Sequence, residues 1–272
     1  MSAANLNRRF WRAGLALHAL LGATLLLAGC ASFSPDAGFA AVEQTAKEQL
    51  GKEVRWARSD ADHDLIDKRV SELLARPLTV DDAVQVALLN NRGLQATFQQ
   101  LGITEAEVVQ AGRLPNPGFS FARLTRGDEL ELERGFHFNL ARLLAMPLVA
   151  EVEARRFEQT KGMVAMSVLS LAADTRRAYF NALAAEETVR YMRQVQQAAE
   201  ASAELARRME QVGNFNKLQR AREQSFYADA ALNLARAEQA QRATRERLIR
   251  RLGAWGAMTR FTLPERLPDL PD

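Results

Sequence analysis

Hydrophobic and polar positions follow a helical pattern between Leu148 and Leu263, and no proline interrupts this run. It is rich in Ala, Leu, Arg, Gln and Glu, which favour helices, whereas proline breaks them. The one clear turn signal before Gly253 is Val212-Gly213-Asn214-Phe215-Asn216. We therefore predict a long helix over 148–211 (roughly 96 Å at the rise of an α-helix), a tip at 212–216, a helix over 217–252 and a C-terminal tail over 253–272.

A shorter helical pattern precedes this run. Thr79 is a typical N-cap residue, and Asp81 and Asp82 follow in the first turn, where the helix dipole favours negative charge. Apolar residues then recur at helical spacing as far as Gly112, with an irregular point at Asn90-Asn91. The pattern predicts a helix over 79–112. Together with the helix over 217–252 it matches the length of the long helix, so we expect the two to lie end to end along it.

Between residues 117 and 144 the period of the pattern changes to two, which is typical of strands. Apolar Leu130, Leu132, Phe136, Phe138 and Leu140 alternate with polar residues, and Arg134 breaks the apolar face. A weaker strand over 119–125, interrupted by Arg123, precedes the turn Arg126-Gly127-Asp128-Glu129. A transmembrane hairpin and a soluble hairpin on a core fit this pattern equally well. In a membrane, strands from other chains or repeats would have to close the barrel.

The N-terminus has the layout of a secretory signal over residues 1–29. Three arginines precede an apolar run over 13–28, which is short for a spanning helix of about 20 residues. The ending Leu27-Ala28-Gly29-Cys30 resembles the bacterial lipobox, which implies acylation of Cys30, the only cysteine. Ala31 after it implies sorting to the outer membrane. The alternative is an ordinary signal, or a single membrane anchor, with an incidental cysteine.

Removal of the signal changes the interpretation of the charge. The whole chain holds 36 Lys and Arg against 33 Asp and Glu, and residues 1–29 hold three of the arginines and no acid. The mature chain is therefore formally neutral, and the basic sequence pI is no evidence for a nucleic-acid partner.

Residues 30–78 are polar and mixed, and we interpret them as a solvated linker between the anchor and the body, with a short helix near 64–74. Asp60, Asp62, His63 and Asp64 could suggest a metal site, but no second histidine or cysteine lies nearby. We predict no metal and no cofactor other than the covalent lipid on Cys30.

Small residues are frequent in both helices around the tip and allow helices to approach closely. They include Ala172, Ala173, Ala178, Ala182, Ala184 and Ala185 before the tip and Ala228, Ala230, Ala231, Ala235 and Ala237 after it. A lone helical hairpin would leave much of this stripe in water, so we expect a homo-oligomer; the alternative is a monomeric bundle.

Several motifs, in order, resemble the TolC-like outer-membrane efflux channel family over residues 77–270. They are Pro77-Leu78-Thr79-Val80-Asp81-Asp82-Ala83-Val84, Ala87-Leu88, Asn90-Asn91, Gln110-Ala111-Gly112-Arg113-Leu114-Pro115-Asn116-Pro117, the strand pair, the long helix, the tip, Leu263-Pro264 and Leu267-Pro268. The resemblance implies a mainly α fold. Long antiparallel helical hairpins would form an α-barrel wall, and the two-stranded hairpin would contribute to an outer-membrane β-barrel.

The resemblance also implies a function. Members export substrates passively, projecting from the outer membrane into the periplasm, where a periplasmic adaptor (membrane fusion protein) and an inner-membrane efflux pump supply them. Val212 and Gly213 match the family's adaptor-contact tip, Asn214 and Phe215 fill the turn, and Asn216 stands where Thr or Ser is common. The alternative for the tip is a good turn without a partner, since glycine tolerates a left-handed backbone.

Family subunits carry two such repeats and assemble as trimers, whereas this chain holds one. We therefore expect either a truncated or split product, with a non-functional channel half as one alternative, or six copies in place of three double-repeat subunits.

Two other classes of protein compete with the channel. A periplasmic coiled-coil lipoprotein would lack the strand pair, and an adaptor would carry glycine-bearing β motifs on both sides of the helical hairpin. An enzyme is disfavoured, since His18, His63 and His137 are scattered and no nucleophile elbow, phosphate loop or zinc spacing accompanies them.

Overall fold

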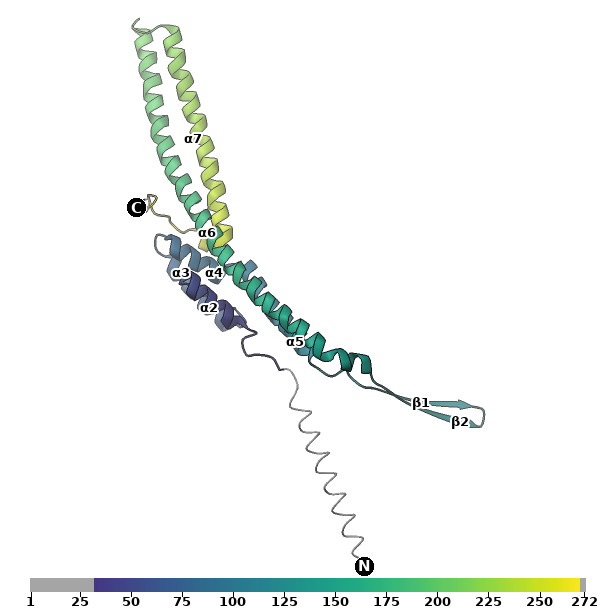
Figure 1. Cartoon of the computed structure of the whole chain (residues 1–272). Helices are drawn as coiled ribbons and strands as arrows, with labels where there is room; N and C mark the ends of the chain where they lie inside the picture. Colours follow the sequence, from purple (N-terminus) through teal and green to yellow (C-terminus); the bar gives the residue numbers. More distant parts are fainter. Residues whose placement is uncertain (1–31, 270–272) are drawn as a thin grey trace, which may run out of the picture. The chain divides into compact units, whose positions relative to one another are not determined.

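The structure is a computed structural model that describes residues 32–269 (Figure 1). Cys30 and the signal expected over 1–29 lie outside the described residues. The described chain is mainly helical with one two-stranded antiparallel sheet, which confirms the predicted fold class. Its elements are α2 (Phe39–Leu50), α3 (Asp60–Leu74), α4 (Val80–Asn90), α5 (Arg92–Ala111), β1 (Gly118–Arg126), β2 (Glu129–His137), α6 (Leu140–Gln211), α7 (Lys217–Leu252) and the 3-10 helix η1 (Gly256–Thr259).

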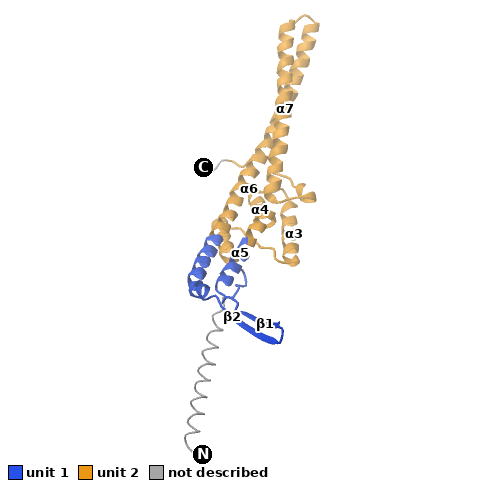
Figure 2. Cartoon of the chain, turned by 90° about the vertical axis from the view of Figure 1, so that its right-hand side faces the viewer, with its two compact units in different colours: residues 1–38, 100–161 blue, residues 39–99, 162–272 orange. Residues whose placement is uncertain are grey.

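The chain divides into two compact units (Figure 2). Unit 1 comprises residues 1–38 and 100–161, and it carries the β-hairpin with the adjoining ends of α5 and α6. Unit 2 comprises residues 39–99 and 162–272, and it carries the remaining helices and the C-terminal tail.

The core of unit 2 lies where α3 and α4 pack against the middle of α6 and the end of α7. Its buried side chains are Ile66, Val70, Leu73, Leu78, Ala83, Val86, Ala87, Leu89, Tyr179, Ala182, Leu183, Leu248, Leu252 and Phe261. Tyr179 donates its hydroxyl to the carbonyl of Leu78 at 2.9 Å, and the amide of Leu78 donates to the carbonyl of Thr262 at 2.8 Å. These two bonds join α6, the start of α4 and the tail. Burial raises the pKa of the Tyr179 hydroxyl, and the charge of Asp82 adds to the effect.

The interpretation of residues 30–78 as a solvated linker is wrong for the described part. Phe39 and Val42 of α2 are buried, as is Trp56 after it. The Phe39 ring meets Phe98 of α5 edge-on, with centroids 4.9 Å apart. Only three side chains each of α2 and α3 are buried, and charged residues surround them in the sequence. The apolar spacing was therefore too sparse to distinguish a half-buried helix from a linker.

The helix predicted over 79–112 is two helices. Thr79 caps α4 as predicted, since its side chain accepts a hydrogen bond from the amide of Asp82 at 3.1 Å. At Asn91 the backbone turns extended, with ψ 113, and α5 begins at the next residue. The irregular point seen in the sequence is therefore a real helix boundary.

The long helix begins earlier than predicted, at Leu140 instead of residue 148, and the hairpin correspondingly ends at His137. The amide of Arg142 donates to the Asn139 side chain at 2.9 Å, so Asn139 acts as an N-cap for the leucine-rich run that follows. Pro147 lies inside the helix. The prediction treated this proline as a boundary, because proline removes a backbone hydrogen bond there.

The second helix of the long pair, α7, has the bounds predicted for it and ends at Gly253 in a left-handed conformation. Among the described helices, none combines the length and apolarity that crossing a bilayer requires.

Candidate functional site

The first candidate site is the β-hairpin of unit 1, whose strands pair in one register from Gly118↔His137 to Arg126↔Glu129. The two loop residues between the strands are Gly127 and Asp128, and Gly127 has φ 62. A positive φ at the first of two loop residues is what a type II′ turn requires, and its twist matches that of the strands. The turn therefore specifies the register.

The register assigns each side chain to a face, because opposite residues of an antiparallel pair share a face. One face gathers Phe119, Phe121, Arg123, Thr125, Leu130, Leu132, Arg134 and Phe136. The other gathers the polar side chains Ser120, Arg126, Glu129, Glu131, Glu133 and His137 with Ala122 and Leu124. The apolar side chains are exposed, from 45% for Leu132 to 73% for Phe119. This hairpin presents to its surroundings what a soluble protein would bury.

Both outer edges of the hairpin lack a partner strand within residues 32–269. An isolated two-stranded hairpin is marginally stable in water, and unpaired edges accept further strands. The geometry therefore suits strand addition combined with apolar contact along one face.

The second candidate site is the turn of unit 2 between α6 and α7. Gly213 adopts φ 82, and the amide of Asn214 donates to the carbonyl of Met209 at 2.8 Å, which closes the end of α6. Val212 is 71% exposed, and Gly213 and Asn214 are exposed as well. The predicted tip residues are therefore together and accessible, except that Phe215 is half-buried.

Asn216, which stands where Thr or Ser is common in the resembled family, is the N-cap of α7. Its side chain accepts from the amide of Gln219 at 2.9 Å, and the Gln219 side chain accepts from the amide of Asn216 at 2.9 Å. Asn, Ser and Thr all serve as caps of this kind. Across the turn, Arg220 and Glu210 form an ion pair at 2.9 Å. Asn216 thus fills a capping role that Ser or Thr could also fill.

Near the turn, Glu204 of α6 accepts hydrogen bonds from two arginines of the same helix. Arg207 donates through two nitrogens at 2.7 and 2.8 Å, and Arg208 donates at 2.8 Å. These bonds, chiefly those from Arg207, lower the pKa of Glu204 from 4.5 to about 2.

We expect the Glu204 carboxyl to stay ionised at pH 3. Because its folded pKa is depressed, its contribution to stability is complete above 4.5 and is lost as the pH falls through about 2. Carbon-detected NMR titration of labelled glutamate measures this directly. Arg207→Ala should raise the pKa toward 4.5, and Arg208→Ala should raise it less; a value near 4.5 in the unchanged protein would contradict the geometry.

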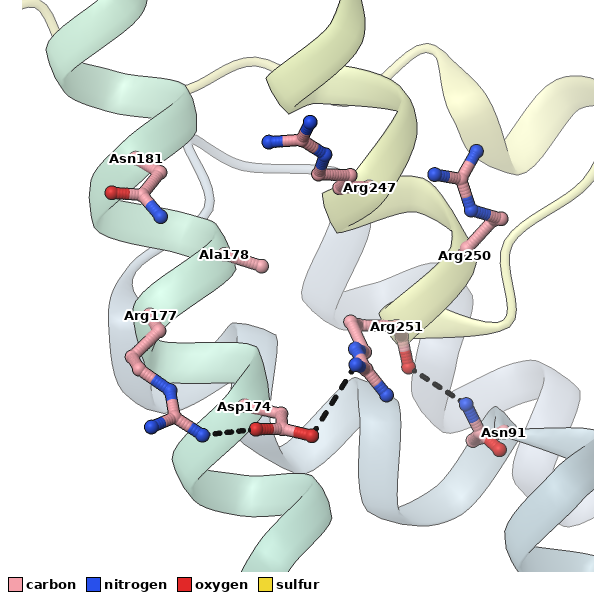
Figure 3. A pocket seen from close by; sticks show the side chains of 8 residues that line it. All are labelled: Asn91, Asp174, Arg177, Ala178, Asn181, Arg247, Arg250 and Arg251. Atoms are coloured by element: carbon pink, nitrogen blue, oxygen red, sulfur yellow. Dashed lines mark hydrogen bonds and ion pairs between the residues drawn. The ribbon is translucent and has the colours of Figure 1, made fainter.

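A pocket of about 470 Å³ lies in unit 2 where α7 ends (Figure 3). Four arginines line it: Arg177, Arg247, Arg250 and Arg251. Arg177 and Arg251 both pair with Asp174, the latter at 3.3 Å. The hydrogen bond from Arg177, followed by the charge of Arg251, lowers the pKa of Asp174. Arg250 and Arg251 occupy the last turn of α7, where positive charge offsets the helix dipole.

Beside this pocket, two asparagines at the α4–α5 boundary cap α7. Asn90 donates its side-chain amide to the carbonyls of Leu252 and Gly253 at 3.0 and 2.9 Å. Asn91 donates to the carbonyl of Arg251 at 3.0 Å and also accepts from the amide at the start of α5, that of Leu94. The sequence marked this pair as an irregularity and as part of a family likeness. Its capping role became visible only in the structure.

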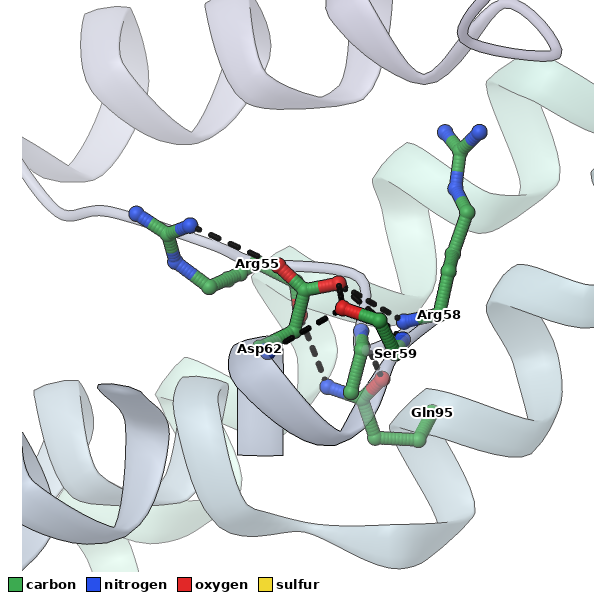
Figure 4. A network of polar contacts seen from close by, with 6 residues as sticks. Arg55, Arg58, Ser59, Asp62 and Gln95 are labelled. Carbon is green, nitrogen blue, oxygen red and sulfur yellow. Dashed lines mark hydrogen bonds and ion pairs between the residues drawn. The ribbon is translucent and has the colours of Figure 1, made fainter. Parts of the chain in front are cut away.

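Of the acidic residues considered for a metal site, Asp62 is part of a helix cap (Figure 4). Ser59 and Asp62 make a capping box at the start of α3, and the carboxylate also accepts from the amide of Arg58 at 3.2 Å. The Ser59 hydroxyl bond, then the Arg58 amide, lowers the pKa of Asp62. Gln95 of α5 donates to the carbonyl of Arg55 at 2.8 Å, which ties the segment before α3 to α5 within unit 2. Within residues 32–269 no group of three His, Cys, Asp or Glu could hold a metal ion.

Sequence comparison finds no match to a protein-family model or to a curated protein. Structure comparison finds similar folds. A membrane protein from Pseudomonas aeruginosa has TM-score 0.59 and 17% identity, covering 71% of this chain and 48% of that one. The CmeC outer membrane channel of Campylobacter jejuni has TM-score 0.59 and 15% identity, covering 85% and 51%. CusC, whose structures concern folding and transmembrane channel formation, has TM-score 0.56 and 17% identity. The match covers 70% of this chain and 46% of CusC.

The chain spans about half the length of these three proteins. The resemblance to TolC-like channels predicted from the sequence is confirmed at the level of the fold. The hairpin, the long helix α6 and its partner α7 thus belong to a fold that this chain shares with outer-membrane channel proteins.

Proposed function

We propose that this chain is the outer-membrane channel component of a tripartite efflux system, through which small molecules or ions leave passively. The observation that carries the proposal is the exposed apolar face of the β-hairpin, on a fold shared with outer-membrane channels. Transfer of a Phe or Leu side chain from water to an apolar medium contributes roughly 1.5–3 kcal/mol. Arg123 and Arg134 oppose this gain by about 2–4 kcal/mol each if they lie at the bilayer midplane.

The proposed partners follow from the remaining features. Further copies or repeats would supply the missing strands and cover the small-residue stripes of α6 and α7. A periplasmic adaptor, handing over substrates from an inner-membrane efflux pump, would contact Val212, Gly213, Asn214, Phe215 and Asn216. An acyl group on Cys30 would attach the chain to the outer membrane. The exposed turn and the lipobox likeness support these assignments.

Fractionation of cells tests the location. The mature protein is expected in the outer-membrane fraction with a mass that includes the acyl chains, and Cys30→Ser should abolish the acylation completely. Mass spectrometry of the separated fractions reads both results, and Ser32→Ala is the matched control. A wild-type protein that is soluble and monomeric in periplasmic extract would refute the channel proposal.

Cross-linking tests the adaptor contact. Because an acylated Cys30 has no free thiol, a single cysteine introduced at Val212 is the only reactive thiol in the chain. A photoactivatable label there is expected to capture the adaptor in intact cells. A label on Glu43→Cys, an exposed position of α2, is the control and should capture none. Equal capture at both positions would indicate that the turn is not the contact.

A further inference from the structure

We propose that residues 32–38 form a short fixed strap that holds Cys30 close to unit 1, so that the lipid bilayer meets the chain on the unit that carries the β-hairpin. Glu105 is the positioning residue of this strap. The inference rests on the proposed acylation and membrane location, and it replaces the solvated linker over residues 30–78 expected from the sequence.

The first attachment of the strap is a hydrogen-bonded clamp between Ser34 and Glu105. The amide of Ser34 donates to Glu105 Oε1 at 2.6 Å, and the Ser34 hydroxyl donates to the same oxygen. The Glu105 side chain is only 7% exposed although it belongs to a surface helix, α5. A buried carboxylate needs hydrogen-bond donors, and removing them leaves its desolvation uncompensated. The clamp is therefore a specific contact between residues 71 positions apart.

The second attachment follows four residues later. Gly38 has φ 71 and lies so close to α6 that an added Cβ would approach Lys161 Cδ to 2.8 Å and Phe157 Cζ to 2.9 Å. Ala37 before it is buried and has φ 52, the one positive φ of a non-glycine residue within residues 32–269. An alanine holds this conformation only where its surroundings enforce it. The strap is thus fixed to α5 at Ser34 and to α6 at Gly38, both within unit 1.

The length of chain between the clamp and the anchor is small. Cys30 precedes Ser34 by four residues, and an extended chain spans at most about 3.6 Å per residue, or roughly 14 Å in all. A linker of the length expected from the sequence, ending at residue 78, would have allowed a far wider range of distances between Cys30 and the folded part of the chain. The acyl chains must therefore enter the bilayer close to Ser34, on unit 1.

This placement matters for the hairpin. Glu105 and β1 belong to the same unit, and β1 begins at Gly118, shortly after α5 ends at Ala111. An anchor held at a fixed reach from α5 limits the depth at which the exposed face of the hairpin can lie in the bilayer. The partner that the strap serves is a lipid surface, and its role is to position the hairpin within it.

Proteolysis of the purified, acylated full-length protein tests the clamp. Phe33 is 56% exposed, and chymotrypsin can cleave the peptide bond between Phe33 and Ser34. We expect this cleavage only when the hydrogen bonds of Ser34 to Glu105 are broken. Glu105→Ala is expected to raise the initial rate of this cleavage about tenfold, in line with losing hydrogen bonds to a charged group. Glu107→Ala, on the same helix but exposed, is the matched control and should stay within twofold. Glu105→Gln keeps a hydrogen-bond acceptor, so its initial rate of cleavage should lie between those of Glu105→Ala and Glu107→Ala. This variant also controls for misfolding of the alanine variant.

A second measurement tests the placement of the bilayer. A dye on Leu132→Cys in the hairpin is quenched by brominated lipid in outer-membrane vesicles. Either Glu105→Ala or an eight-residue Gly-Ser insertion between Ser32 and Phe33 is expected to change this quenching at least twofold. Equal cleavage in all variants, or quenching unchanged by both alterations, overturns the strap while the channel stands. A third outcome is that the dye at residue 132 is not quenched in the protein with the wild-type strap, although Glu105→Ala still raises the rate of cleavage. That outcome refutes the membrane location of the hairpin.

Discussion

Phe98→Ala is expected to lower the free energy of unfolding by about 3–5 kcal/mol, the range for removing a fully buried aromatic side chain. Phe98 is 0% exposed and stands edge-on to Phe39 of α2 at 4.9 Å. The loss combines the apolar transfer, the cavity that remains and the aromatic pair, which alone contributes about 0.5–1.5 kcal/mol. Urea denaturation followed by circular dichroism measures it.

Phe226→Ala is the matched control for this substitution. Phe226 lies on α7 and is 53% exposed, so its removal is expected to change the stability of the monomer in detergent by less than about 0.5 kcal/mol. If Phe98→Ala and Phe226→Ala proved equally mild, α2 would not pack on α5, and the linker interpretation of residues 39–58 would be restored.

The second large effect is expected at the end of α7, where Gly253→Ala should cost about 3 kcal/mol or more. Gly253 has φ 66, and a non-glycine residue in that region costs about 1–2 kcal/mol. An added Cβ would also come within 2.5 Å of the Asn90 carbonyl oxygen and 2.9 Å of Asn91 Cα. These are backbone atoms that cannot rotate away. The α4–α5 boundary must therefore shift, which weakens three hydrogen bonds of about 1 kcal/mol each.

Gly51→Ala separates the two contributions. Gly51 has φ 62 and ends α2, but an added Cβ there meets nothing within 4 Å. Its substitution should cost only the backbone strain, about 1–2 kcal/mol. The difference between the two variants in urea denaturation isolates the contact of α7 with Asn90 and Asn91. Equal losses would show that this contact contributes nothing.

Much of the candidate site could be predicted from the sequence. The alternation of Leu130, Leu132 and Phe136 identified the strand that the structure contains, and Val212 to Asn216 identified the turn. Both features are local, since a strand face and a helix cap depend on residues a few positions apart. The errors were local as well: Pro147 suggested a boundary, but the Asn139 cap begins α6 upstream of it.

Other parts could not be predicted, since their signals were weak or ambiguous. Asn90 and Asn91 looked like a break in one helix, yet their side-chain amides donate hydrogen bonds to the end of another helix, 160 or more residues later in the chain. Glu105 was not singled out by any pattern in the sequence. Only the folded chain shows that it is buried under Ser34.

By itself, then, the sequence determined the helices around the turn and the hairpin with its two faces, and it predicts the acylation of Cys30 and a neutral mature charge. Each depends on periodicity, caps or composition within a short window. The tertiary structure decided that α2 and α3 belong to a core, that α7 ends against the α4–α5 boundary, and that Ser34 and Gly38 are held on unit 1. These depend on contacts between distant residues, whose burial and hydrogen bonding exist only once the chain has folded.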